Sequence, residues 1–367
     1  MSGSGIARAI RPRLLILTPD FPPDHGGVQA LVHRLALELR GFRVRVLTVA
    51  RPGGDSFDRA SPLDVRRTGR GLGNERARML ALNAAAVATA ARFRPDLILS
   101  AHVIASPAAA LIRRLLGVAT LQYFHANEIL GRPWLAGFAA GQADTSVAVS
   151  AYTASLVRAT GVRPARLLRI PPGVDLPSEP LSLPAERPTV LTIAQLKHTY
   201  KGHDVLTDAL VKVRREVRDV EWVVIGEGPL RASVEARAHA AGLAGAVRFL
   251  GAVCDAERDD WLRRASVLAM PSRLPGEGFG IVYLEANAFS KPVLAGNVAG
   301  PLDAVADGVS GLLVDPHDAD AVARALTLLL TDRELAHRLG SQGAARAQGF
   351  AWPLVAARLE AALGELL

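Results

Sequence analysis

The chain has 367 residues, of which half are hydrophobic and 21% are charged, a composition typical of a globular and not of a disordered protein. One hydrophobic core rarely grows to this length, so we expect two domains. The formal net charge is +8, but only four residues are lysine. Heavy use of arginine and alanine indicates a GC-rich coding bias rather than a binding surface, and we expect no nucleic-acid partner.

Membrane-spanning and secreted classes are disfavoured. Cys254 is the single cysteine, so no intramolecular disulfide forms, which suits a reducing compartment. Residues 1–10 hold no apolar stretch of signal-peptide length, and the apolar run 81–91 is shorter than the about 20 residues of a membrane span. We expect a cytoplasmic protein whose membrane contact, if any, is peripheral at the inner face. One arginine cluster is a candidate for anionic headgroups or an acidic acceptor, although such clusters are usually solvated: Arg66, Arg67, Arg70, Arg76 and Arg78.

The first half of the chain alternates predicted strands and helices. A continuous apolar run predicts a buried strand at 14–18, and a rigid loop then ends in Gly26-Gly27. Apolar residues at helical spacing predict helices over 28–39 and 107–116. The further predicted strands are 44–48, 97–100, 120–124 and 146–149. This alternation predicts a parallel sheet with helices on both faces.

A proline-rich stretch separates the two halves. Residues 171–188 hold six prolines and form the best linker candidate. The α/β alternation then restarts, and amphipathic helices are predicted over 319–330 and 352–367. The strands predicted after the linker are 189–193, 222–225, 247–249, 267–270, 292–295 and 311–314.

The strongest motif lies at the predicted strand-to-helix turn of residues 271–286. Gly278 and Gly280 allow close approach of a ligand to the backbone, and free N–H groups at the helix start attract phosphate. If both were helical, Glu277 and Glu285 would lie about 12 Å apart. A glycosidase pair lies roughly 5–9.5 Å apart. The spacing therefore suits contacts to two ends of one extended ligand better than an acid/base pair. By itself, however, the spacing favours a structural explanation, with one glutamate at a helix N-terminus and one at the surface.

Two weaker motifs also follow predicted strands. Lys201-Gly202 opens a helix after a polar loop, where a lysine can offset the charge of a leaving diphosphate, although most loop lysines are only solvated. Gly26-Gly27-Val28-Gln29 opens the first helix, but no third glycine completes the dinucleotide-binding fingerprint.

Together these motifs resemble the retaining glycosyltransferases of family 4, which have the GT-B fold, and the N-terminal glycine loop is similar to that of the phosphatidylinositol mannosyltransferase branch. Glu277 and Glu285 match the family's pair of glutamates separated by seven residues, and Lys201-Gly202 matches its Lys-Gly after the first donor-domain strand. Further matches in the family's order are His125, Ser150 with Tyr152-Thr153, 172–175, 226–229, 249–251, Asp307-Gly308 and 311–314. The resemblance covers nearly the whole chain.

The resemblance implies two Rossmann-like doubly wound domains facing a central cleft. Residues 1–176 would form the acceptor domain, 177–188 the linker and 189–351 the nucleotide-sugar domain, while the helix 352–367, carrying Trp352, Leu359 and Leu363, would pack back on the first domain.

The resemblance also implies roles for individual residues. On the donor side, Lys201 would contact the diphosphate, Glu277 the sugar hydroxyls and Glu285 the ribose. The backbone of 278–281 would meet sugar and phosphate, that of Val253 the base, and Gly27 would close over the diphosphate from the other domain. His125 would lie beside the reacting sugar. The implied catalytic residues are His125, Lys201 and Glu277; the donor-binding ones are Gly27, Gln195, Lys201, Val253, Glu277, Gly278, Phe279, Gly280, Ile281 and Glu285; the acceptor-binding ones are Gly26, Gln29, His125 and Asn127.

One residue departs from the family pattern. Gln195 stands where the family usually has arginine, so one charged contact to the diphosphate is missing, and His198 or Arg273 are alternative sources of the cation. Asp318-Ala319-Asp320 is similar to a metal-binding motif of another glycosyltransferase fold, but its place at a predicted helix start favours a cap. We predict no metal and no other cofactor.

The predicted activity is transfer of a hexose or N-acetylhexosamine, with retention, from a nucleotide diphosphate sugar (UDP- or GDP-linked) to a hydroxyl of a lipid-linked envelope precursor or a natural product. Lys201 and the helix start would stabilise the leaving group. Two alternatives remain open. One is another GT-B enzyme, such as an epimerase or a phosphorylase, and the other is an inactive sugar-nucleotide-binding protein, which Gln195 makes conceivable.

Overall fold

The structure, a computed structural model, describes residues 11–178, 187–274 and 276–367, and most of the linker predicted at 177–188 lies outside them. The chain forms two compact units. The first comprises Met1–Ala148, Leu156–Ile170 and Ala356–Leu367, and the second comprises Val149–Ser155 and Pro171–Val355. The sequence boundary at 176 differs from this division, because the Val174 N–H donates to Phe350 O within the second unit.

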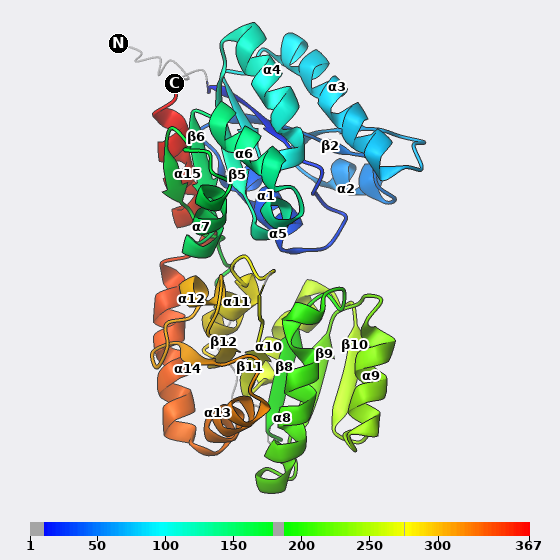
Figure 1. Ribbon diagram of the computed structural model, residues 1–367, viewed down its shortest axis with the longest axis vertical. Helices are drawn as coiled ribbons and strands as arrows, with labels where there is room; N and C mark the ends of the chain where they lie inside the picture. The colour runs from blue at the N-terminus through cyan, green and yellow to red at the C-terminus, as the bar shows by residue number, and fades with distance from the viewer. Residues whose placement is uncertain (1–10, 179–186, 275) are drawn as a thin grey trace, which may run out of the picture. The chain divides into compact units, whose positions relative to one another are not determined.

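The first unit contains a seven-stranded parallel sheet in the order β3-β2-β1-β4-β5-β6-β7 (Figure 1). Its strands are β1 Arg13–Leu17, β2 Arg43–Val49, β3 Asp64–Thr68, β4 Leu97–Ser100, β5 Ala119–Phe124, β6 Thr145–Ala148 and β7 Leu167–Arg169. Its helices are α1 Gly27–Glu38, α2 Gly54–Ala60, α3 Glu75–Phe93, η1 Val103–Ala105, α4 Ser106–Leu116, α5 Ala126–Gly131 and α6 Pro133–Gln142, while α7 Ala151–Ala159 begins in the second unit and ends in the first. β3 and β7 are partly buried edge strands that were not predicted, because β3 carries mainly polar residues and β7 has only three residues.

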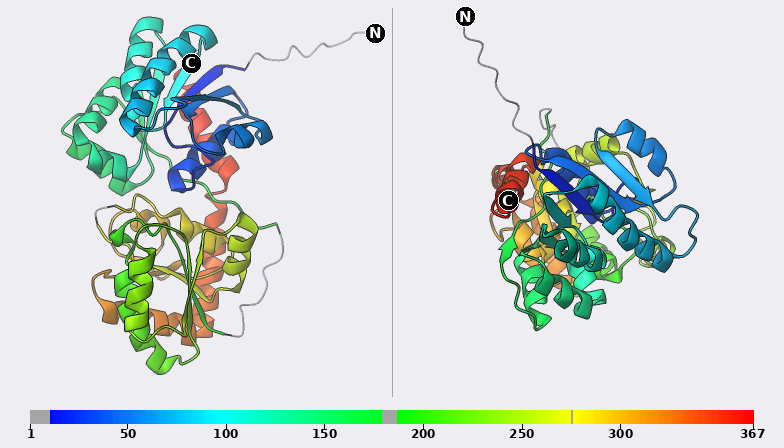
Figure 2. Two further views of the ribbon diagram at one scale, coloured as in Figure 1. Left: turned by 90° about the vertical axis from the view of Figure 1, so that its right-hand side faces the viewer. Right: turned by 90° about the horizontal axis from the view of Figure 1, so that it is seen from above.

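The second unit contains a six-stranded parallel sheet in the order β10-β9-β8-β11-β12-β13. Its strands are β8 Thr189–Ile193, β9 Glu221–Ile225, β10 Val247–Gly251, β11 Val267–Met270, β12 Val293–Gly296 and β13 Gly311–Val314. Its helices are η2 Thr199–Lys201, α8 His203–Glu216, α9 Arg231–Ala240, α10 Asp255–Arg264, α11 Ile281–Ala288, α12 Pro301–Ala304, α13 Ala319–Thr331 and α14 Arg333–Gln348. In both units helices cover the two faces of the sheet (Figure 2). The prediction of two Rossmann-like domains is thus confirmed.

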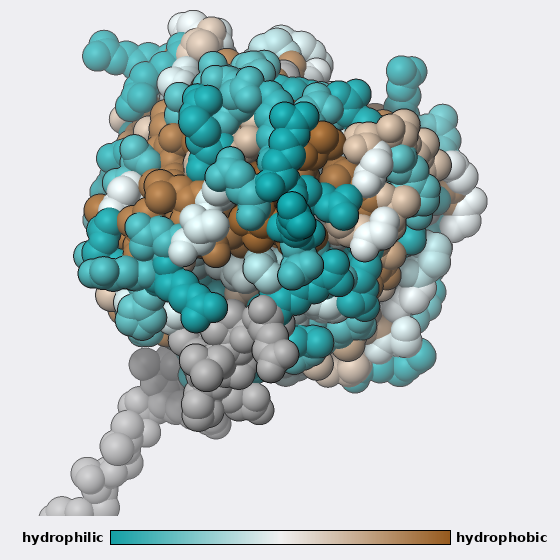
Figure 3. All heavy atoms as spheres, turned by 90° about the horizontal axis from the view of Figure 1, so that it is seen from below, coloured by the Kyte–Doolittle hydropathy of each residue, from teal (hydrophilic) through white to brown (hydrophobic). Residues whose placement is uncertain are grey.

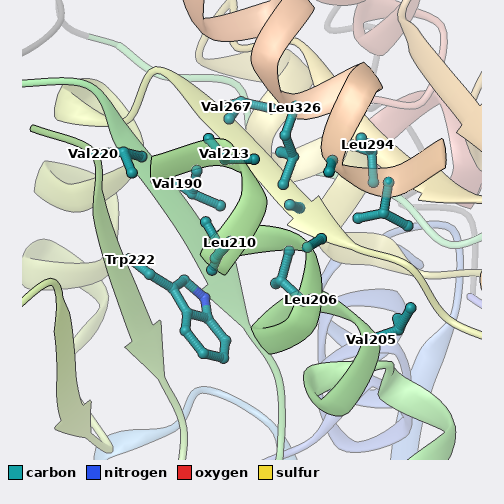
Figure 4. Close-up of a cluster of buried hydrophobic side chains, with 14 of the residues drawn as sticks. Val190, Val205, Leu206, Leu210, Val213, Val220, Trp222, Val267, Leu294 and Leu326 are labelled. Atoms are coloured by element: carbon teal, nitrogen blue, oxygen red, sulfur yellow. The ribbon is translucent and has the colours of Figure 1, made fainter. Parts of the chain in front are cut away.

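The core of the second unit lies between its sheet and helices α8 and α13. Trp222 from β9 is 1% exposed and lies beside Leu210 of α8 in the cluster of Figure 4. The Trp222 indole N–H donates to Thr192 Oγ1 at 3.0 Å, so its one polar atom is satisfied inside the core. Burying each large apolar side chain here contributes about 1.5–3 kcal/mol. Seen from below, the end of this unit carries mainly hydrophilic residues, with hydrophobic ones between them (Figure 3).

The last helix, α15 Trp352–Gly364, contributes to the core of each unit in turn. Trp352 packs against Gly173 in the second unit, where a Cβ on Gly173 would meet the indole at 2.4 Å. Leu359 and Leu363 are fully buried in the first unit, where Glu360 also accepts from the Gly41 N–H at 2.8 Å. Among the described residues, no helix is both long enough and apolar enough to cross a bilayer.

The arginine cluster of the first unit is largely engaged by its own carboxylates. Arg70 pairs with Asp55 and Arg66 with Asp64, both at the surface. The Arg67 side chain is only 2% exposed; it donates to both Asp58 carboxylate oxygens at 2.8 Å and to Pro22 O. Arg67 therefore holds the loop that precedes Gly26 in place. The interpretation of Arg67 as part of a candidate anion-binding surface is corrected by these contacts.

Candidate active site

Two donor-side residues predicted from the sequence, Lys201 and Glu277, meet where the second sheet reverses its strand order. β8 and β11 are neighbours, and the next strands along the chain lie on opposite sides of them. In doubly wound sheets, ligands bind beyond the carboxyl ends of the strands at such a switch point. The loop after β8 carries Lys201 and the loop after β11 carries Glu277. Lys201 Nζ and Glu277 Oε2 lie 2.5 Å apart, so the structure joins residues that are 76 positions apart.

This ion pair is largely removed from solvent. The Lys201 side chain is 16% exposed and that of Glu277 is 11% exposed. Burial lowers the pKa of Lys201, but the attraction of Glu277 outweighs it, and the pKa lies above its usual value. Lys201 thus remains protonated over the physiological range. A fixed ammonium of this kind can stabilise charge that develops on a leaving phosphate.

Glycines allow the two loops to approach each other. Gly202 has a φ of 79°, and a Cβ there would lie 2.2 Å from the Pro271 carbonyl oxygen, so no side chain fits. Gly280, with a φ of 89°, is the N-cap of α11. Gly278, Phe279 and Gly280 lead directly into Ile281, where the first N–H groups of the helix have no partner within the helix. This predicted helix start is confirmed, and it can receive an anion.

Glu285 lies one turn into α11 with a cationic neighbour that the sequence did not indicate. Arg258 of α10 places Nη1 3.9 Å from a Glu285 carboxylate oxygen. Burial raises the pKa of Glu285, and Arg258 partly opposes this shift. Because Arg258 is 27 positions away on another helix, no spacing in the sequence connects the two.

Two further donor-side residues lie on the loops after β8 and β10 of the second sheet. Gln195 follows β8 and is exposed, and Val253 follows β10 and is half-buried. Neither alternative cation is freely available beside Gln195. Arg273 donates to Asp204 at 2.7 Å and to Thr199 O, while burial and nearby lysines lower the pKa of His198, so its ring is neutral at physiological pH.

In the first unit, polar side chains also gather at the switch point, between β1 and β4. Gln29 of α1 donates from Nε2 to Asp20 Oδ1 at 3.0 Å. A second Asp20 oxygen lies 3.8 Å from His102 Nε2, beyond the end of β4. Gly26 is the N-cap of α1 and Gly27 its first residue.

His125 follows β5, the strand next to β4, and is 8% exposed. Its Nε2 lies 3.2 Å from Ala101 O, and since a carbonyl only accepts, Nε2 carries the proton and Nδ1 has a lone pair. Burial lowers the pKa of His125 to about 4. The ring is therefore neutral, and the capping box at the start of α5 uses its remaining acceptor nitrogen. Asn127, two residues later, is exposed in the first turn of α5.

Sequence reasoning missed several residues of this polar cluster, namely Asp20, His102 and Glu128. Glu128 follows His125 by three positions, the spacing of a helix capping box, and the structure contains that box. This was the one available signal. His102 and Asp20 become neighbours only through the order of the strands.

Comparisons with known proteins give the family. Residues 25–177 match the family described as Glycosyltransferase Family 4, and residues 177–346 match Glycosyl transferases group 1. The chain is 33% identical, over 369 residues, to a GDP-mannose-dependent alpha-(1-6)-phosphatidylinositol monomannoside mannosyltransferase of Mycobacterium tuberculosis, covering 90% of this chain and 92% of the relative. The chain belongs to glycosyltransferase family 4. The predicted family is confirmed.

Other members support the same assignment. A D-inositol 3-phosphate glycosyltransferase of Xylanimonas cellulosilytica is 37% identical over 224 residues, 56% of this chain and 52% of the relative. Among solved structures, Anabaena HepE in complex with UDP and glucose superposes with a TM-score of 0.80 at 21% identity, covering 96% of this chain and all of that one. Sucrose-phosphate synthase from Thermosynechococcus elongatus gives 0.82 at 22% identity, covering 97% and 99%. These structures establish the fold of this family 4 glycosyltransferase.

Proposed function

We propose that this family 4 glycosyltransferase moves mannose from GDP-mannose, with retention, to a hydroxyl of an inositol-containing lipid. The observation that carries the proposal is the Lys201–Glu277 pair at the switch point of the second sheet, a preformed ammonium beside the start of α11. Its chemistry suits a leaving nucleoside diphosphate. The choice of donor and acceptor rests on the relative that is similar over 90% of this chain.

In this mechanism Lys201 and the backbone of 278–281 receive the diphosphate charge, and Glu277 binds hydroxyls of the sugar. Glu285 would hold the ribose and Val253 the base. On the acceptor side, Gly26, Gln29, His125 and Asn127 would orient the hydroxyl. Retention rests on family membership, and we propose that no metal ion takes part.

A lipid acceptor requires access to a membrane surface. We propose a cytoplasmic protein that contacts the inner membrane peripherally. Flotation of the full chain with vesicles that contain anionic lipid tests this, and recovery only in the lipid-free fraction would contradict it.

The activity is tested in two steps. Thermal shifts with GDP, UDP and ADP identify the nucleotide, and we expect GDP to give the largest shift. Transfer of radiolabelled sugar from a panel of donors to inositol lipids then identifies the product, whose anomeric configuration is read by NMR. A product with inverted anomeric configuration would refute retention. A larger thermal shift with UDP than with GDP would mean that the donor is a UDP-sugar and not GDP-mannose.

Gln195 is the reason for a second candidate function. Without the family's arginine, a sugar-nucleotide-binding protein that lacks transfer activity remains a second candidate. Tight nucleotide binding with no transfer from any donor would support that alternative.

A further inference from the structure

Glu128 is buried where two loops of the first unit meet. It is 5% exposed, and each carboxylate oxygen accepts a backbone N–H. Oε1 accepts from His125 N–H at 2.9 Å and Oε2 accepts from Val103 N–H at 2.8 Å. One side chain thus ties the loop after β4 to the residue proposed to act beside the sugar.

The second contact of Oε2 constrains its proton. Oε2 lies 3.3 Å from Nδ1 of His102, and that Nδ1 accepts the Ile104 N–H at 3.0 Å. A nitrogen that accepts a hydrogen bond carries no proton. If Glu128 were ionised, its Oε2 and the Nδ1 of His102 would be two acceptors facing each other in a buried site with no proton between them. The contact is favourable when the carboxyl group of Glu128 holds the proton. A carboxylic acid hydroxyl can share the single Nδ1 lone pair with the Ile104 N–H, in a three-centre hydrogen bond, and still accept from the Val103 N–H.

We propose that Glu128 is an uncharged carboxylic acid that shares its proton with His102 and thereby positions His125 for transfer. Glu128 is a positioning residue, since it acts through the His125 backbone and the β4 loop. The assignment of a role to His125 rests on the proposed function, whereas the shared proton does not.

The surrounding charges are consistent with this arrangement. The groups that face the pair are Asp20 beside His102 Nε2, the neutral His125 ring and Arg132 after α5. Burial raises the pKa of Glu128 to about 8, and Asp20 adds to the shift while Arg132 and the two backbone N–H groups oppose it. Burial, with His125 and Arg132, lowers the pKa of His102 to about 3. One proton therefore resides on Glu128 at neutral pH.

The first test does not depend on activity. The full chain labelled with ¹³C at the Glu side-chain carboxyl carbons is titrated by NMR, and the signal lost in Glu128→Gln is assigned to Glu128. We expect this carboxyl to be protonated at neutral pH and to ionise near pH 8, with the ¹⁵N shifts of His102 showing a bare Nδ1. An ionised Glu128 at neutral pH, or a proton on His102 Nδ1, would overturn the proposal even if transfer activity is found.

The second test asks whether the proton matters for turnover. In Glu128→Gln, the side-chain N–H₂ group must take the place of Oε2 in order to donate to His102. It then faces the Val103 N–H, which is also a donor, so this buried N–H loses its acceptor. We expect kcat to fall at least about tenfold with donor KM nearly unchanged. The wild-type kcat/KM should also decline above pH 8, about tenfold per pH unit, and the variant should lack this decline.

Glu365→Gln is the matched control, since it makes the same substitution in an exposed pair with Arg166 in the same unit. It should leave both kcat and the pH profile as in the wild type. If Glu128→Gln keeps the alkaline decline, or reduces activity no more than Glu365→Gln does, the positioning role is refuted. A null result in every transfer assay combined with the expected NMR titration would instead count against the proposed function alone.

Discussion

Two glutamates of α11 and its preceding loop have different neighbours, and this difference separates their roles. Glu277 contacts Lys201 at 2.5 Å, while Glu285 lies near Arg258 at 3.9 Å. A carboxylate that holds the ammonium of Lys201 orders the group that, in the proposed mechanism, would meet the leaving diphosphate. A carboxylate near α10 is suited to a part of the donor that does not react.

We therefore expect Glu285→Gln to weaken nucleotide binding roughly tenfold with a smaller change in turnover, because hydrogen bonds made equally in ground and transition states affect affinity. Glu277→Gln should instead lower kcat or sugar discrimination. Calorimetric titration with GDP and steady-state kinetics measure the two effects. An equal loss of nucleotide affinity in both variants would refute the division.

Gln195 stands where the resemblance to the family predicts an arginine. It is exposed on the loop after β8, and Arg273 is already engaged by Asp204. A charge-assisted hydrogen bond is about twice as strong as a neutral one. We expect Gln195→Arg to bind the nucleoside diphosphate product roughly tenfold more tightly. If Gln195→Arg leaves the affinity for the nucleoside diphosphate unchanged while Lys201→Ala abolishes it, position 195 does not face the diphosphate.

At the scale of the element, Arg67 of β3 holds the proline-rich loop that leads into α1. Its guanidinium bonds to Asp58 of α2 and to Pro22 O, and its side chain is 2% exposed. Removing one member of a buried pair leaves an unpaired charge. Arg67→Ala should therefore lower the free energy of unfolding of the first unit by about 3–5 kcal/mol.

Arg66, its neighbour in the same strand, supplies the control, since its side chain is 63% exposed. Arg66→Ala should change the free energy of unfolding by less than about 0.5 kcal/mol. Urea unfolding followed by circular dichroism measures both variants. Equal effects would mean that burial of the pair does not determine its contribution.

The start of α13 explains why an acidic motif need not bind metal. Asp318 accepts from the N–H groups of Asp320 and Ala321, so the prediction of a helix cap is confirmed, and Asp320 pairs with Lys212. We expect transfer to survive EDTA, since Lys201 and backbone amides would carry the diphosphate charge. Abolition by EDTA with recovery in magnesium or manganese would contradict a metal-independent mechanism.

At the scale of the whole molecule, α15 contributes buried side chains to both units. Trp352 is 4% exposed in the second unit and Leu359 is fully buried in the first. Trp352→Ala should cost about 3–5 kcal/mol and Leu359→Ala about 2–5 kcal/mol. Hydrogen exchange should show reduced protection mainly in β8–β13 for the first variant and mainly in β1–β7 for the second. The same pattern of lost protection in both variants would argue against this division of the helix.

Much of the fold followed from local patterns in the sequence. Apolar runs such as Leu14–Leu17 are buried because parallel strands are covered on both faces, and they gave the strands at the centres of both sheets. At the sheet edges, β3 carries mainly polar side chains and β7 has only three residues, so neither gave such a signal. α14 was also missed, since its exposed polar residues leave only a weak apolar periodicity.

The candidate site, like the fold, was predicted in part from the sequence. Lys201, Glu277 and Glu285 were identified from the sequence, because each stands in a motif beside a strand end. The Lys201–Glu277 contact, the approach of Arg258 to Glu285 and the cluster of Asp20, His102 and Glu128 required the tertiary structure. These residues are far apart in the chain and are brought together by the strand order at each switch point. Sequence therefore determined which chemical groups stand at the strand ends, and packing decided which of them meet and which atom holds a proton.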